Sequence, residues 1–230
     1  AELYEKVGQA PHASAAYERY VRQHPNPFEI AIEARARLAN LSHKAGQEAR
    51  RLQWARELVE AEQKGGRERT DRTRHLGAQN ALVLAEPADA AYRQAQLVEP
   101  LKKNLKIKKE RMQKALDAYG LAADYGVAEV STAAVYRSAE LYHDFSKALL
   151  KSQRPKGLNA EELEQYNVLL EEQAFPFEEK AIEVHEINVR RTKDEIYDRW
   201  VKSSFTALGQ LRPVRYAKSE KGEGVIRAIR

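Results

Sequence analysis

The chain has 230 residues, and 32% of them are charged. Its formal net charge is +5, and it contains no cysteine. The lack of cysteine excludes a thiol nucleophile, a cysteine zinc site and an iron–sulfur cluster. No stretch holds the roughly 18 consecutive apolar residues that a membrane-spanning helix needs, and no signal peptide stands at Ala1. Because the helical pattern begins at Ala1 without a methionine, we expect a fragment of a longer precursor, in which a removed signal or lipid anchor leaves no trace.

Spaced glycines and prolines divide the first part of the chain into helical segments. A first helix ends over residues 3–7, and a second extends from near Pro11 to about His24. The next pair is predicted at residues 28–44 and 47–63, with Gly46 as the turn between its members. The segment that follows, GGRERTDRTR, is expected to be exposed.

The middle of the chain predicts two short helices and one long helix. Residues 73–85 form the first, and residues 91–98 form a separate helix after Pro87 that ends at Pro100. A long helix then extends from Leu101 to Tyr125, with Pro100 as a favourable residue at its start.

The stretch from residue 112 to residue 150 predicts the pair of helices around which the chain is organised. Apolar residues recur there at spacings of three and four, which places them on one stripe of each helix. These residues are Met112, Ala115, Leu116, Tyr119, Ala122 and Ala123, then Val130, Ala134, Leu141, Tyr142, Phe145 and Leu149. Gly126 ends the first helix, and Ser131 or Thr132 is expected to cap the second. A connection this short predicts antiparallel packing.

The last part of the chain predicts two helices and a tail. Asn159 followed by Glu162 resembles a capping box at the start of a helix that reaches Gln173. Pro176 then opens a final helix of about 30 residues that includes Leu208. Periodicity is lost beyond residue 209, so we expect one domain over residues 1–209, and over residues 210–230 a mobile tail or a link to a missing domain.

Two short patterns resemble the tetratricopeptide repeat. In Ala115-xxx-Tyr119-xx-Ala122 and near Ala16-xxx-Tyr20, small residues let two helices approach and an aromatic ring fills the gap between them. The segment AAYERYVRQHPNPFEIAIEARARLANL resembles the repeats of bacterial periplasmic adaptors such as the Tol-system coordinator and the outer-membrane assembly lipoproteins. The resemblance implies an all-α fold of antiparallel helix pairs stacked as a right-handed solenoid, with degenerate repeats and a long C-terminal helix.

The sequence predicts no catalytic or metal site. No phosphate-binding loop, dinucleotide fingerprint or HExxH pair is present. His143 with Asp144 and His185 with Glu186 are sequence neighbours, and adjacent helical residues point about 100 degrees apart, so neither pair can chelate a metal alone. We therefore expect no enzyme activity, cofactor or small-molecule substrate.

Tyrosines mark the candidate partner-binding residues, because the chain has 11 tyrosines but only 5 phenylalanines and 2 tryptophans. A tyrosine can pack its ring while its hydroxyl stays in water. In a helical solenoid such half-exposed aromatics line a concave groove that binds a peptide or helix. The candidates are Tyr136, Arg137, Tyr142 and His143, although Tyr142 can equally be a core residue.

A basic run on the long middle helix allows two interpretations. Seven basic residues face a single acid there: Lys102, Lys103, Lys106, Lys108, Lys109, Arg111 and Lys114, with Glu110. The face with Lys102, Lys103, Lys106, Lys109 and Arg111 is either an ordinary solvated surface or a site for nucleic acid, anionic lipid or an acidic protein. No aromatic residue lies among these lysines to stack bases.

The leading hypothesis is a non-enzymatic protein–protein scaffold of the bacterial cell envelope, located in the periplasm, that binds a partner peptide or helix in its groove. The alternative is a cytoplasmic regulator of the same repeat type that uses its basic face, residues 102–114, to bind nucleic acid or an acidic partner. A third hypothesis is an enzyme with an unrecognised site in a helical bundle. The sequence names no partner beyond another protein.

Overall fold

The computed structural model describes residues 1–217, and every regular element among them is a helix. The all-α fold class predicted from the sequence is therefore confirmed. The helices in chain order are α1 (Glu2–Lys6), α2 (Ala10–Gln23), α3 (Phe28–Lys44), α4 (Glu48–Lys64), α5 (Asp71–Gln94), α6 (Leu101–Ala123), α7 (Ala128–Leu150), α8 (Ala160–Arg190), α9 (Arg199–Leu211) and α10 (Pro213–Tyr216), with short 3₁₀ turns at Gly66–Glu68 and Arg191–Asp194. None of these helices is long and apolar enough to cross a membrane.

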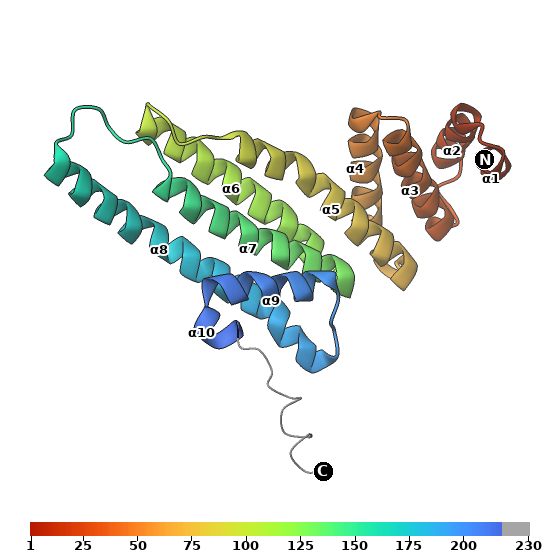
Figure 1. Ribbon diagram of the computed structural model, residues 1–230. Helices are drawn as coiled ribbons and strands as arrows, with labels where there is room; N and C mark the ends of the chain where they lie inside the picture. The colour runs from red at the N-terminus through yellow and green to blue at the C-terminus, as the bar shows by residue number, and fades with distance from the viewer. Residues whose placement is uncertain (218–230) are drawn as a thin grey trace, which may run out of the picture.

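Each helix packs against the next one in the chain, and several also pack against the next but one. Figure 1 shows α1 to α4 at one end of the molecule and the long helices α6, α7 and α8 at the other, with α5 between them. The helices α3, α5, α7 and α9 contact one another in that order. These contacts form a layer of alternate helices. Within this layer α7 has the most buried residues, and α9 is the last helix in chain order.

Turns between the early helices lie where glycines were predicted to break them. Gly46 and Gly126 have φ angles of +69° and +70°, a conformation that costs a residue with a Cβ atom more than it costs glycine. The prediction of α3 is correct at both ends, and α6 begins directly after Pro100 as expected. The organising pair is present, with α6 and α7 in contact on either side of a short connection.

Two prolines that were predicted to separate helices lie inside helices instead. Pro87 is within α5 and Pro176 is within α8. A proline removes one backbone hydrogen bond, but both rings face solvent, while Ala85 and Ala174 beside them are buried in the core. Because the buried stripe continues through each proline, packing holds both helices together, and the predicted separate helix at residues 91–98 is wrong.

The predicted final helix from Pro176 to Leu208 is also wrong, because it is two helices joined by a turn. α8 ends at Arg190, and α9 begins at Arg199. The Asp198 carboxylate accepts hydrogen bonds from the backbone amides of Trp200 and Val201, both at 2.9 Å. Such a side-chain cap satisfies amides that have no partner within the helix, and Asp198 was the signal that the sequence analysis missed.

Ser131 and Thr132 do not cap α7 as expected, because the helix begins at Ala128. The Ser131 hydroxyl donates to the Ala123 carbonyl at the end of α6, at 3.0 Å. The Thr132 hydroxyl contacts the Asp198 carboxylate at the start of α9. Both side chains therefore tie α7 to its neighbours.

Two further predictions, an exposed segment GGRERTDRTR and a domain boundary at residue 209, differ from the structure. Within the segment expected to be exposed, Thr73 is fully buried, and Arg69 binds the fully buried Glu62 through two hydrogen bonds of 2.7 and 3.1 Å. The predicted boundary at residue 209 lies within α9, and α10 follows with the Tyr216 hydroxyl 3.0 Å from Glu186. The rest of the predicted tail, residues 218–230, lies outside the described residues.

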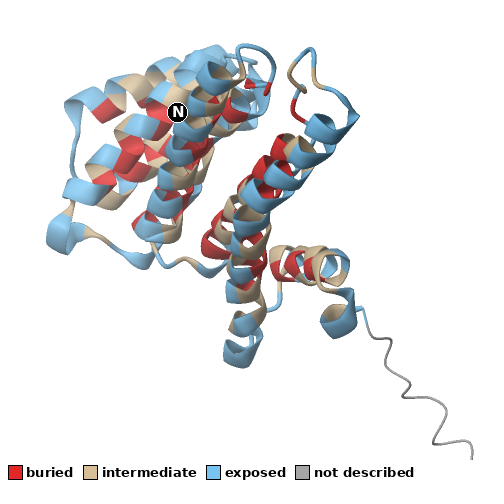
Figure 2. Cartoon of the chain, turned by 90° about the vertical axis from the view of Figure 1, so that its left-hand side faces the viewer, coloured by how far each residue is buried: buried red, intermediate tan, exposed pale blue. Residues whose placement is uncertain are grey.

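The main core lies among α5, α6, α7 and the middle of α8. Tyr119 of α6 is 4% exposed, Phe145 of α7 is fully buried, and the Tyr92 hydroxyl of α5 donates to the Leu141 carbonyl of α7 at 3.1 Å. Figure 2 shows the buried residues on the sides of the helices that face one another. Burial of these aromatic rings is a large part of what holds the three helices together.

We predict that Tyr119→Ala lowers the free energy of unfolding by roughly 3 to 5 kcal/mol, because truncation of a buried ring loses apolar contact and leaves a cavity. Urea unfolding followed by circular dichroism measures this change. Leu121→Ala on the same helix is the control, since Leu121 is 40% exposed and should change stability little. A loss below about 1 kcal/mol for Tyr119→Ala would show that the ring does not fill the core as described.

Candidate partner-binding site

A hollow of about 370 Å³ lies where α5, α7 and α9 come together, and we call it the α5–α7 hollow. Asp89 and Arg93 come from α5, Tyr119 from α6, Ala133 and Arg137 from α7, and Trp200 from α9. The α5 residues are four apart, as are the α7 residues, so each pair shares one helix face. Contacts of α5 with α7 and of α7 with α9 bring those faces together.

Trp200 is the centre of an aromatic and arginine cluster at the rim of this hollow. The guanidinium carbons of Arg137 and Arg199 lie 5.2 and 4.6 Å from its ring centroid. The ring of Tyr136 lies 5.4 Å away, centroid to centroid. A guanidinium over an indole face is held by the ring quadrupole, which keeps its hydrogen-bond donors available.

The charged groups of the hollow differ in whether they already have partners. Arg93 donates to Asp89 at 3.1 Å and to Asp144 at 2.8 Å. Glu86, another lining residue, accepts two hydrogen bonds from Arg51 at 2.7 and 3.0 Å. Within residues 1–217, no carboxylate lies within ion-pair distance of Arg137. Arg137 is therefore the cation of this hollow that a ligand carboxylate can reach.

The floor of the hollow is apolar and uncharged. Leu82, Ala90 and Ala133 line it. Burial raises the pKa of Tyr119 to about 12, so its hydroxyl stays neutral at physiological pH. The hollow thus offers an apolar surface beside Arg137, which has no acidic partner within residues 1–217.

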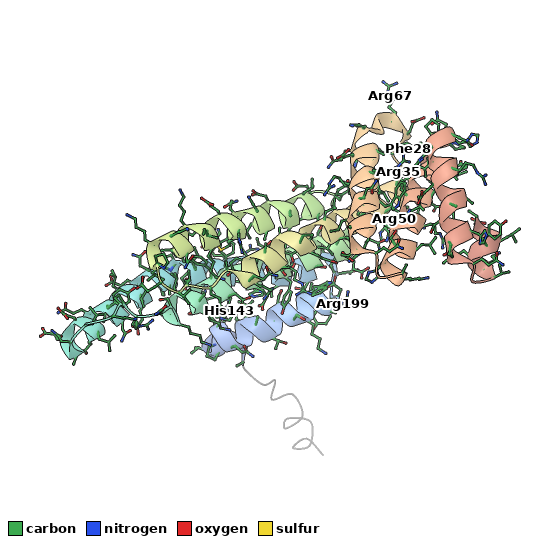
Figure 3. The ribbon with its side chains drawn as sticks, turned by 90° about the horizontal axis from the view of Figure 1, so that it is seen from above. Phe28, Arg35, Arg50, Arg67, His143 and Arg199 are labelled. Atoms are coloured by element: carbon green, nitrogen blue, oxygen red, sulfur yellow. The ribbon has the colours of Figure 1, made fainter. Side chains whose placement is uncertain are left out.

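A second, smaller hollow of about 240 Å³ lies between α7 and α9. Tyr136, Glu140, His143 and Lys147 of α7 line one side, and Gln210 is among the α9 residues on the other. Burial lowers the pKa of His143, which favours its neutral form. Figure 3 labels His143, on α7, and Arg199, at the start of α9.

Three of the four predicted partner-binding residues lie on the side of α7 that faces α9. Tyr136 and His143 line the smaller hollow, and Arg137 lines the α5–α7 hollow. Tyr142 lines neither hollow and packs, partly buried, against the main core. Its position, six residues after Tyr136, turns it to another side of the helix.

Ser204, His185 and Glu140 lie in an order that resembles a catalytic triad. Ser204 Oγ is 3.3 Å from His185 Nδ1, and Glu140 Oε1 is 3.4 Å from His185 Nε2. However, Ser204 and His185 are fully buried, and the Asn188 amide donates to Ser204 Oγ at 3.0 Å. A substrate cannot reach this hydroxyl, so the arrangement is a buried polar network that joins α7, α8 and α9.

Both ring nitrogens of His185 lie near polar groups of this network. Because Asn188 donates to Ser204 Oγ, the serine hydroxyl can donate to His185 Nδ1. The other ring nitrogen, Nε2, lies within ion-pair distance of Glu140 Oε1, at 3.4 Å, but the two atoms do not form a hydrogen bond of good geometry. This interaction with His185 lowers the pKa of Glu140 from its ordinary value of 4.5.

The basic face of α6 is smaller than predicted. Lys102, Lys103, Lys106 and Lys109 are exposed, but Lys108 is buried and its Nζ donates to the Ala95 and Tyr92 carbonyls, at 2.8 and 3.3 Å. Arg111 is half-buried, and its Nη1 donates to the Ala91 carbonyl at 2.8 Å. Lys108 and Arg111 therefore bind carbonyls of the last turn of α5 and of its cap residue, Ala95, where a helix leaves carbonyls without intrahelical partners.

Trp200 and Arg93 were not singled out from the sequence. Each lies far along the chain from Arg137, and no local pattern connects the three. The capping signal of Asp198 would have separated α9 and so drawn attention to Trp200 at its start. Within residues 1–217, no group of three or more histidine, aspartate or glutamate side chains is arranged to hold a metal ion.

Comparison of the sequence with known protein families found no match, and searches among curated proteins and solved structures found none either.

We predict that Glu140→Gln lowers the free energy of unfolding at pH 7 by about 0.5 to 1.5 kcal/mol, because it weakens the interaction with His185. The pKa of Glu140 is lower in the folded chain than in the unfolded chain, so its contribution is present above pH 4.5 and is lost as the pH falls through the folded value. Urea unfolding of both proteins between pH 7 and pH 3 measures this. Glu164→Gln, at an exposed position on α8, is the control, and a Glu140→Gln difference that does not shrink with falling pH would contradict the assignment.

Proposed function

We propose that this chain is a non-enzymatic scaffold that binds a segment of a partner protein in the α5–α7 hollow. The partner segment carries a carboxylate next to an apolar or aromatic side chain. The carboxylate binds Arg137, and the apolar side chain lies on the floor between α5 and α7. The observation that carries this proposal is the Arg137 guanidinium, stacked on Trp200 without an acidic partner within residues 1–217.

The choice of residue types supports a protein partner. Tryptophan, tyrosine and arginine are the residues that most often contribute large binding energies at protein interfaces. The Arg137 and Trp200 pair is held in place by Tyr136 and Arg199, so little side-chain freedom is lost on binding.

The packing order supports a tetratricopeptide-like solenoid as the framework. If α1 and α2, α3 and α4, α5 and α6, and α7 and α8 are taken as pairs, the first helices α3, α5, α7 and α9 contact one another in sequence. In such solenoids the first helices line the concave side. In addition, Ala115, Tyr119 and Ala122 of the small–aromatic–small pattern are all buried in α6.

We further propose that the scaffold works in the periplasm of a bacterial cell envelope. This proposal rests on the resemblance of the N-terminal sequence segment to the repeats of periplasmic adaptors. The lack of cysteine is compatible with an oxidising compartment.

Binding of nucleic acid through α6 is less well supported than partner binding. Of the seven basic residues in the run, Lys108 and Arg111 are occupied by carbonyls of α5. Lys106 also lies 4.0 Å from Glu110. Fewer free cations mean fewer phosphate contacts and weaker electrostatic binding.

The test is selection of peptides that bind the chain from a random display library, followed by affinity measurements on the selected peptide. We expect an enriched aspartate or glutamate beside an apolar or aromatic residue. Arg137→Ala should weaken binding about thirtyfold, equivalent to about 2 kcal/mol. Lys106→Ala, an exposed cation on α6, should leave the affinity nearly unchanged.

Two results would contradict the proposed site. Selected peptides without an acidic residue would remove the role of Arg137. Loss of binding in the Lys106→Ala protein but not in the Arg137→Ala protein would move the site to the basic face.

A further inference from the structure

The first half of α8 has an exposed apolar stripe that lies outside the proposed peptide site. Val168 is 50% exposed and Phe175 is 62% exposed, whereas Ile182, seven residues further along, is buried. Residues seven apart on a helix lie nearly on one line. The three side chains therefore form one stripe, of which only the last is covered.

The covered end of this stripe lies beneath α9 and α10. Glu179, three residues before Ile182, accepts a hydrogen bond from Arg212 at 2.9 Å. Glu186, four residues after it, accepts one from the Tyr216 hydroxyl at 3.0 Å. Figure 1 shows α9 crossing α8 near its middle, and among the described residues no further helix lies over the teal first half of α8 on the side of α9.

The neighbouring helix α7 also has an exposed apolar residue beyond the part that α9 covers. His143 lines the smaller hollow against α9. Leu150, seven residues later at the end of α7, is 37% exposed. The strip between α7 and α8 that holds α9 thus extends beyond the end of α9 with apolar residues on both sides.

Carboxylates surround the uncovered part of the stripe. They lie three or four positions from Val168 or Phe175, and are Glu164, Glu171, Glu172 and Glu178. In the described part of the chain, none of these four lies within ion-pair distance of a basic side chain. By contrast, Glu179 and Glu186 at the covered end bind Arg212, at 2.9 and 3.8 Å.

The contact already made by α9 and α10 indicates which chemistry this surface accepts. These helices bring the fully buried Val201 and Leu208 together with Arg212 and Arg215, the latter 3.5 Å from Glu186. We propose that the uncovered strip of Leu150, Val168 and Phe175 binds a basic amphipathic helix of a partner protein. Its apolar side would cover the stripe, and its lysines or arginines would pair with the free carboxylates.

This surface is separate from the α5–α7 hollow, and it selects the opposite charge. The hollow offers an arginine to an acidic segment, while the α8 strip offers carboxylates to a basic helix. The two proposals can therefore fail independently.

The probe is a fluorescent amphipathic peptide of about 18 leucine and lysine residues, long enough to form a helix on the surface. Binding to the full chain is measured by fluorescence anisotropy. A peptide with the same leucine pattern but glutamate in place of lysine should not bind. We expect Val168→Gln and Phe175→Gln each to weaken binding of the basic peptide about tenfold.

Leu169→Gln is the matched control, because Leu169 is 49% exposed and adjacent to Val168 but points about 100 degrees away. It should leave the affinity unchanged, as should Arg137→Ala. Equal circular dichroism spectra and unfolding midpoints would show that all variants fold. Glu171→Gln combined with Glu172→Gln should weaken binding at low salt and matter less at high salt.

Several results would overturn the proposal. Equal binding of the glutamate peptide, or equal loss in Leu169→Gln, would show unspecific hydrophobic adsorption. A wild-type dimer in sedimentation that becomes a monomer with Phe175→Gln would identify a second copy as the occupant. A tenfold gain in peptide affinity on replacing Ile226 and Ile229 with glutamine would identify the chain's own C-terminal segment as the occupant.

Discussion

The structure depends on the burial of α7 on several sides at once. This helix has buried residues around much of its circumference, and α5, α6, α8 and α9 all contact it. A helix that is apolar over most of its surface must be covered over most of its surface. Three alanines, Ala133, Ala134 and Ala139, are nearly completely buried and leave room for neighbouring backbones to approach. The return of α9 across α7 and α8 supplies the last part of that cover.

Polar groups within this cover define how α9 lies on it. The Asn188 amide of α8 donates both to the Thr132 carbonyl of α7, at 2.9 Å, and to Ser204 of α9, at 3.0 Å. Thr132 in turn contacts Asp198, which caps α9. Apolar burial alone tolerates sliding of one helix along another, whereas a buried hydrogen bond that is broken by sliding costs free energy. The network therefore favours one register of α9, and this register brings Trp200 to Arg137.

The sequence predicted most helices because apolar spacing and glycine turns are local signals. It failed at Pro87 and Pro176, where burial of the flanking residues against other helices outweighs the loss of one hydrogen bond within each helix. It did not indicate that Lys108 is buried, because the Tyr92 and Ala95 carbonyls that this lysine binds lie outside its own helix. Of the candidate site, the sequence indicated the residues on α7 but not Trp200, since only the turn after α8 brings that side chain back.

The resulting molecule has two chemically distinct surfaces on the helices that surround α7. One contains an arginine stacked on a tryptophan, and the other contains apolar residues among carboxylates that have no basic partner within residues 1–217. Both depend on where α9 begins and ends, so the burial of α7 beneath α9 is the central claim. Native-state hydrogen exchange tests it most directly, because amides exchange slowly where opening requires the loss of much buried contact. The account predicts that the amides of α7 are the slowest to exchange, with those of α9 clearly protected, whereas exchange in α7 as fast as in the exposed first turns of α8 would contradict it.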